Sequence, residues 1–112
     1  MKYEIEKTNI FDRWLNRLKD KTAVNRIMAR LYRVEHGNFG DVKSVGQNLF
    51  ELRFFFGSGY RIYYTMKGEK IVLLLCGGDK SSQKQDIAKA QTMADKIGAD
   101  NNGRDDKQVG CK

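Results

Sequence analysis

The chain has 112 residues, which is enough for one domain with a hydrophobic core and too few for two. Its formal net charge is +7, which favours an anionic partner such as nucleic acid, an acidic protein or a membrane surface. No apolar run has the length of a transmembrane helix, and the N-terminus lacks the apolar segment of a signal peptide, so we expect a cytoplasmic protein without a membrane partner. One histidine and two cysteines without zinc spacing predict neither a metal site nor a disulfide framework, and we expect no cofactor.

The first predicted elements are a short edge strand and two helices. Residues 2–7 alternate between polar and apolar side chains, which is typical of a strand. Thr8 or Asn9 can cap a helix with an apolar stripe of Phe11, Trp14, Leu15 and Leu18. A second helix is expected from a cap at Thr22 to about His36, with a buried stripe of Val24, Ile27, Met28 and Leu31.

Three arginines share the other face of the second helix. Arg26, Arg30 and Arg33 occupy positions i, i+4 and i+7, and no acidic residue lies among them. They form either a solvated face or a stripe that contacts RNA phosphates, and the sequence leaves both interpretations open. His36 follows at the helix end, where we expect it to cap the helix and not to act in catalysis.

Residues 48–80 carry the heaviest apolar load and predict a three-stranded meander after a short strand or extended link at 42–45. The strands are expected at Leu49–Phe56, Tyr60–Met66 and Lys70–Cys76. If residues 57–59 form a three-residue hairpin loop, Phe56 pairs with Tyr60, and Arg53 and Arg61 share one sheet face.

The third strand of the meander, 70–76, is apolar throughout, which suits a strand covered on both faces. Gly77 and Gly78 then form a flexible exit that can bring Lys80 toward the arginine face.

The chain is expected to close with a third helix, from a capping box at Ser82 and Gln85 to Gly98. Residues 99–112 are polar and predict a flexible tail. Residues 1–98 thus form an α+β domain with a small, mostly antiparallel sheet. Two N-terminal helices pack on this sheet, and a C-terminal helix follows.

The candidate site is the cationic face formed by Arg53, Arg61 and Lys80, with Tyr60 and Tyr63 nearby. An arginine fork binds two phosphate oxygens, and a tyrosine ring offers a surface on which a base stacks. In RNA cleavage the 2′-OH attacks the adjacent phosphorus, and charge builds on the phosphoryl oxygens. Fixed cations aimed at that charge lower the barrier.

Both arginines also admit a structural interpretation, which the sequence leaves open. Arg53 can pair with Glu51 or with a neighbouring acid on the sheet surface. Arg61 can stack on Phe55 or Tyr63.

The segment from Phe50 to Ala90 resembles the RelE/ParE toxin superfamily, and it is most similar to the HigB-like, phage-derived "addiction module killer" branch. Four motifs carry the resemblance: ELR, GSGYRIYY, LLLCGGDK and SSQKQDIAKA. The resemblance implies a RelE-like fold over residues 1–98 and a toxin of a type II toxin–antitoxin system. Many members are metal-independent endoribonucleases that cut mRNA in the ribosomal A site and are blocked by a cognate antitoxin, here expected to be a small helix-turn-helix protein.

Position by position, the resemblance also implies roles for the three cations. Arg61 would stabilise the transition-state phosphate, and Lys80 would orient the phosphate or assist the leaving 5′-oxygen. Arg53 would help to activate the 2′-OH or bind the phosphate.

The sequence departs from the family pattern in two places. Some ribonuclease members carry a catalytic Tyr or His in the terminal helix, where residues 83–87 offer only Asp86, and Glu51 stands where some relatives have lysine. The general acid and base therefore stay unassigned. A ParE-like toxin that inhibits DNA gyrase without nuclease activity and a non-toxic phage-derived RNA-binding module are the alternatives.

Overall fold

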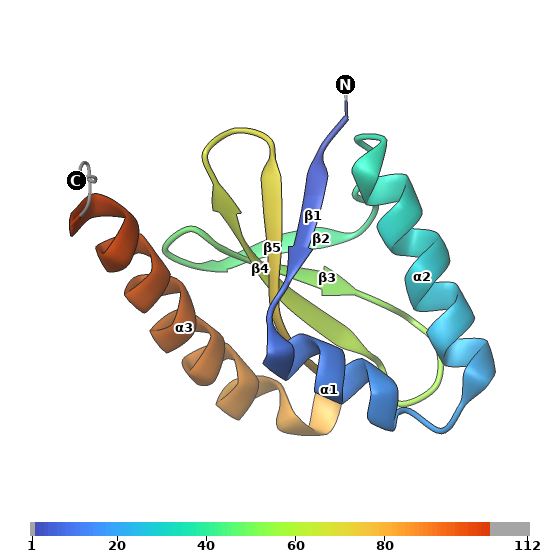
Figure 1. The fold of residues 1–112 in the computed structure, drawn as a ribbon. Coiled ribbons are helices and arrows are strands. Elements are labelled where there is room, and N and C mark those ends of the chain that lie inside the picture. The colour runs from blue at the N-terminus through green and yellow to red at the C-terminus, as the bar shows by residue number, and fades with distance from the viewer. Residues whose placement is uncertain (1, 104–112) are drawn as a thin grey trace.

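The computed structural model describes residues 2–103, which form a five-stranded sheet of order β1-β5-β4-β3-β2 (Figure 1). The strands are β1 (Glu4–Lys7), β2 (Val42–Gly46), β3 (Leu49–Arg53), β4 (Arg61–Lys67) and β5 (Ile71–Gly78). The helices are α1 (Asn9–Arg17), α2 (Lys21–Glu35), the short 3-10 turn η1 (Lys80–Ser82) and α3 (Gln83–Gly103). The edge strand β1 runs parallel to β5, and the other pairs are antiparallel. The predicted α+β class and mostly antiparallel sheet are confirmed.

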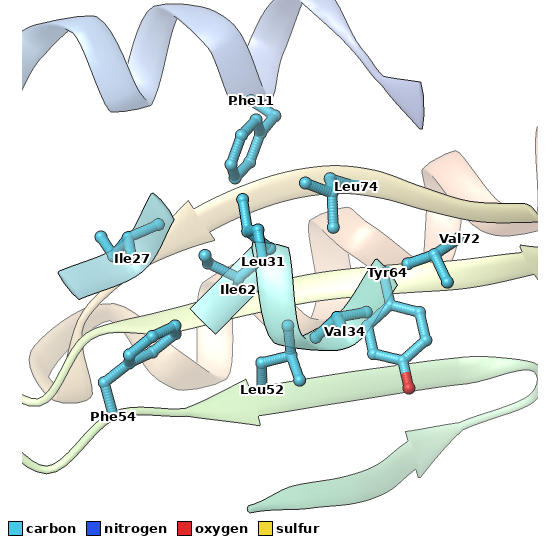
Figure 2. Close-up of a cluster of buried hydrophobic side chains, with 10 residues drawn as sticks. All are labelled: Phe11, Ile27, Leu31, Val34, Leu52, Phe54, Ile62, Tyr64, Val72 and Leu74. Carbon is cyan, nitrogen blue, oxygen red and sulfur yellow. The ribbon is translucent and has the colours of Figure 1, made fainter. Parts of the chain in front are cut away.

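Helices cover both faces of the sheet (Figure 1). On one face, Phe11 of α1 and the side chains of α2 point toward residues of β3, β4 and β5 (Figure 2), and this cluster consists of Phe11, Ile27, Leu31, Val34, Leu52, Phe54, Ile62, Tyr64, Val72 and Leu74. On the other face, α3 contributes two small residues to a second cluster of Leu49, Tyr63, Leu73, Leu75, Cys76, Ala90 and Ala94. Strand β5 has buried side chains in both clusters, as its apolar sequence predicts. None of the helices within residues 2–103 is long and apolar enough to cross a bilayer.

The connection between β3 and β4 is longer than predicted. Strand β3 ends at Arg53 and β4 begins at Arg61, so residues 54–60 join them and Arg53 lies directly opposite Arg61. The expected pairing of Phe56 with Tyr60 in one strand ladder is wrong, because Phe56 and Tyr60 pack on each other with ring centroids 5.6 Å apart in the connection. The register differs from the predicted one by two residues, an even number, so the side-chain faces are preserved and both arginines share a face.

Helix α2 begins earlier than predicted and buries a different stripe. Asp20, not Thr22, is the N-cap, because its Oδ1 accepts hydrogen bonds from the backbone N–H groups of Thr22 (2.9 Å) and Ala23 (3.3 Å). Met28 was expected in the core but is 47% exposed. The buried residues are instead Ala23, Ile27, Arg30, Leu31 and Val34.

Helix α3 also differs from its prediction at both ends. Asp79 is the capping residue of the turn that precedes it, and Ser82 is its capping-box partner instead of the cap itself. The helix continues through Gly98 to Gly103, because a glycine can stay helical when no chain reversal is needed there. The first part of the predicted tail, 99–103, is therefore helical, and residues 104–112 lie outside the described residues.

The glycine pair at the end of β5 permits close packing instead of the predicted flexible exit. Both glycines belong to β5, and they face opposite sides of the sheet. A Cβ on Gly77 would lie 2.4 Å from Cε3 of Trp14 in α1, and a Cβ on Gly78 would meet the carboxylate of Asp86 in α3. The two positions thus let α1 and α3 approach the same strand end.

We expect Gly77→Ala to lower the free energy of unfolding by about 1–3 kcal/mol, because the added methyl group overlaps the Trp14 ring and the packed core has no room to absorb it. Urea denaturation measures this. Gly98→Ala is the matched control: a Cβ there meets nothing within 4 Å, so a stabilisation of up to about 1 kcal/mol is expected. Equal stability of Gly77→Ala and the unmodified chain would contradict the contact.

Candidate functional site

Arg61 and Lys80 meet beside the connection between β3 and β4. Both line an open hollow of about 370 Å³, called here the Arg61–Lys80 hollow, whose other walls are Phe54, Phe55 and residues 57–59. A Cβ on Gly59 would lie 3.3 Å from Cβ of Lys80 and 3.6 Å from Nη1 of Arg61. The backbone N–H of Lys80 also donates to the carbonyl of Ser58 at 3.3 Å. The structure therefore brings these two predicted site residues together.

Arg61 is held from behind by protein acceptors. Its residue is only 8% exposed, and its Nη1 donates to the carbonyls of Gly59 (3.1 Å) and Tyr60 (3.4 Å). Its Nε lies 3.7 Å from Oε2 of Glu51 in an ion pair. The stacking of Arg61 on Phe55 or Tyr63, which the sequence left open as an alternative, is thus replaced by an ion pair with Glu51, and the guanidinium has a fixed position at the wall of the hollow.

Glu51 is fully buried and connects three elements. Its Oε2 accepts hydrogen bonds from the hydroxyl of Tyr63 (3.0 Å) in β4 and from Nε2 of Gln83 (2.8 Å) in α3. Burial and the Glu51 carboxylate raise the pKa of Tyr63 well above its ordinary value, so the phenol remains a donor. The fully buried ring of Tyr63 has no open face for a base, and Tyr63 acts within the fold instead of at the surface.

Arg53 lies opposite Arg61 in the sheet but has a different environment. Its Nε donates to Oδ2 of Asp41 at 3.1 Å, so the neighbouring acid that the sequence left open is Asp41 and not Glu51. Arg53 lines a second hollow, of about 340 Å³, together with residues of α2 and the 54–56 segment. We call this the α2 hollow; its lining residues are Arg26, Ala29, Arg30, Arg33, Asp41, Arg53, Phe54, Phe55 and Phe56.

The predicted arginine stripe of α2 is divided between core and surface. Arg30 is 8% exposed and donates to three backbone carbonyls, those of Phe39 (2.9 Å), Asp41 (2.8 Å) and Arg53 (2.7 Å). Burial lowers the pKa of Arg30, and the Asp41 carboxylate opposes that shift. Arg30 therefore clamps the 39–41 loop to the end of β3 and is not an open phosphate contact, whereas Arg26 and Arg33 are exposed.

Tyr60 is half-buried and supports the loop. Its ring lies 5.6 Å from the Phe56 ring and 6.3 Å from the Trp14 ring, measured between centroids. It fixes the base of the 57–59 turn beside the Arg61–Lys80 hollow. The exposed aromatic ring at the hollow belongs instead to Phe55, which the sequence suggested only as a stacking partner for Arg61.

The side chains that titrate near the site do not supply an evident base. No carboxylate or imidazole is among the described residues that line the Arg61–Lys80 hollow. Asp86 accepts a hydrogen bond from the Ser82 hydroxyl at 2.6 Å, and the Ser81 hydroxyl holds the pKa of Asp79 below its ordinary value. Burial raises the pKa of Cys76 to about 11, so its thiol stays protonated and unreactive.

A metal site is likewise not evident in this part of the chain. Between residues 2 and 103 no three His, Cys, Asp or Glu side chains gather in a way that would hold a metal ion. His36 lies at the far end of α2, where it is the C-cap residue and its ring packs on Tyr32 with centroids 4.5 Å apart.

The fold is that of RelE-type chains from toxin–antitoxin complexes. It matches a chain of the RelBE2 toxin–antitoxin complex from Mycobacterium tuberculosis with a TM-score of 0.59 and 18% identity, over 71% of this chain and 100% of that one. A chain of the intact E. coli RelBE toxin–antitoxin complex matches with a TM-score of 0.54 and 20% identity, over 69% of this chain and 95% of that one.

Residues 13–96 match the family model described as phage-derived protein Gp49-like (DUF891), and the chain belongs to this family. An uncharacterized protein of Haemophilus influenzae is 47% identical over 98 residues, which are 88% of this chain and 99% of that relative. Family and fold together confirm the resemblance to the RelE/ParE superfamily.

We expect Glu51→Gln to destabilise the protein by about 3–5 kcal/mol, because it removes one partner of a buried ion pair and leaves the Arg61 charge uncompensated. The amide retains an oxygen for Tyr63 and Gln83, so the change isolates the charge. Urea denaturation of Glu51→Gln, Arg61→Met and the double variant measures the coupling between the two residues. The double variant should lose clearly less than the sum of the single losses, and strict additivity would show that the two charges do not interact.

Proposed function

We propose that this chain is the toxin of a type II toxin–antitoxin system and that it cleaves translated mRNA on the ribosome as a metal-independent endoribonuclease. The observation that carries the proposal is the Arg61–Lys80 hollow, in which a fixed guanidinium and an exposed ammonium group border one open space. The RelE-type fold and the family resemblance support the same function.

In the proposed reaction the 2′-OH of a nucleotide attacks its own 3′-phosphorus and loses its proton. The P–O bond to the 5′-oxygen of the next nucleotide breaks, which leaves a 2′,3′-cyclic phosphate on one product and a 5′-hydroxyl on the other. Arg61 stabilises the negative charge that develops on the non-bridging oxygens, and its anchoring by Glu51 and two carbonyls means that little reorganisation is needed. Lys80 orients the phosphate or protonates the leaving 5′-oxygen.

The remaining predicted residues have supporting roles in this proposal. In this proposal Arg53, Arg26 and Arg33 bind phosphates that flank the cleaved one, which is supported by their position in the lining of the adjacent α2 hollow. Tyr60 and Arg30 keep the loops of the two hollows in position. The group that accepts the 2′-OH proton is unassigned among residues 2–103.

The proposed partners are mRNA on the ribosome and a cognate antitoxin, for which we expect a small helix-turn-helix protein. The two structural neighbours come from toxin–antitoxin complexes. The net charge of +7 favours an antitoxin segment with acidic residues that covers the cationic hollows.

One observation favours a second candidate, a non-toxic phage-derived RNA-binding module. The described lining of the Arg61–Lys80 hollow contains cations and aromatic rings but no carboxylate or imidazole, which suits binding as well as catalysis. A gyrase-inhibiting toxin without nuclease activity is the third candidate, since it would share the fold.

The test is induction of the chain in bacteria without its antitoxin, followed by primer-extension mapping of translated mRNA. We expect growth arrest and new mRNA ends, and we expect Lys80→Ala and Arg61→Lys each to reduce cleavage about 100- to 1,000-fold, since each removes a donor to the transition state. Lys70→Ala is the matched control: it removes an exposed lysine in the β4–β5 turn, remote from the hollow, and should cleave normally.

The candidate functions give different outcomes. Intact mRNA with inhibited supercoiling would support the gyrase target, and intact mRNA with normal growth would support the binding module. Full cleavage by Lys80→Ala and Arg61→Lys would show that the hollow is not the active site.

A further inference from the structure

We propose that the α2 hollow is a nucleotide subsite, in which the base adjacent to the cleaved phosphate stacks on Phe55 and the next phosphate binds Arg26 and Arg33. The inference rests on the proposed function, because it takes RNA as the ligand. It concerns binding, which is measurable without cleavage.

Phe55 is unusual for its exposure. It is 78% exposed, the most of any large apolar side chain in the described part of the chain, whereas its neighbour Phe54 is 4% exposed and packs in the core. The guanidinium of Arg53 lies 5.9 Å from the centre of the Phe55 ring, which restrains the ring from one side. An aromatic ring that adds almost nothing to the core, and is held at the rim of two hollows, has the properties of a stacking platform.

The charges of the α2 hollow suit a phosphate. Its lining contains four arginines and one acid, Asp41, whose carboxylate pairs with Arg53. Arg30 is already occupied by backbone carbonyls. Arg26 and Arg33 are exposed, and neither forms an ion pair with any residue from 2 to 103, so their charge is available to an anion.

The two hollows adjoin each other through two shared lining residues. Phe54 and Phe55 line both, with Arg61 and Lys80 on one side and Arg26 and Arg33 on the other. A single strand that places one phosphate at Arg61 can therefore lay its neighbouring base on Phe55 and continue into the α2 hollow. The alternation of cation, aromatic ring and cation matches the phosphate–base–phosphate repeat of single-stranded RNA better than an acidic peptide, which has no need of the exposed ring.

The experiment measures the affinity of the full chain for a short, fluorescently labelled single-stranded RNA by anisotropy. The RNA carries 2′-O-methyl groups throughout, so it cannot be cleaved. We expect Phe55→Ser to weaken binding about 5- to 100-fold and Phe55→Trp to retain it, because only the latter keeps a stacking surface. Arg33→Gln should also reduce the slope of log affinity against log salt by about 0.7.

Tyr32→Ser is the matched control, since Tyr32 is another exposed aromatic residue of α2 (64%) but lines neither hollow. Unchanged affinity in Phe55→Ser, or an equal loss in Tyr32→Ser, would overturn the subsite. Loss of antitoxin binding with unchanged RNA affinity would also overturn it, and would assign the surface to a protein. If Phe55→Ser binds RNA normally while the unmodified chain still cleaves mRNA, the subsite alone fails; if Phe55 governs RNA affinity but no cleavage occurs, the proposed function alone fails.

Discussion

The buried carboxylate of Glu51 is the constraint on which the candidate site depends. A charged group without contact to solvent is costly unless it is paired and hydrogen-bonded, and Glu51 obtains these contacts from Arg61, Tyr63 and Gln83. Because the three partners come from β4 and α3, the carboxylate fixes the start of α3 against the sheet at the same time as it orients the guanidinium. The requirement that stabilises the fold therefore also preorganises the cation proposed to act on phosphate.

The arginines of this protein differ in function because they differ in partners. Arg30 satisfies three backbone carbonyls, Arg61 a buried carboxylate, and Arg53 the half-exposed carboxylate of Asp41. Each of these three guanidinium groups is held by contacts within the folded chain. The positive charge that an incoming anion meets first is therefore carried by the exposed side chains of Lys80, Arg26 and Arg33. A count of basic residues in the sequence overstates the binding surface, since it treats all cations alike.

Alternation predicted which side chains share a sheet face, because face depends only on odd and even positions and survives a shift of two residues. The predicted register of β3 against β4 was wrong, because this register depends on how Phe56 and Tyr60 pack in the 54–60 connection. The identities of the partners of Arg30 and Arg53 were equally inaccessible, because these partners lie in the 39–41 loop, which approaches the two arginines only after folding. Glu51 did leave a signal, an acid between Phe50 and Leu52 in an apolar strand, and such an acid predicts a buried partner.

The distinction between fixed and exposed cations bears on what the site can do. Exposed cations attract any phosphate, in the ground state as much as in the transition state, and such uniform binding does not accelerate a chemical step. Arg61 differs because its guanidinium donates to two backbone carbonyls and forms an ion pair with Glu51, so it can be complementary to one arrangement of phosphoryl oxygens only. The negative charge of Glu51 weakens the attraction of Arg61 for phosphate in general. In the proposed reaction, the rigidity that Glu51 confers on Arg61 favours the geometry in which negative charge has developed on the phosphoryl oxygens. In the proposed function, a partly neutralised but rigidly held arginine beside an exposed lysine is the combination that would separate catalysis from binding on this surface.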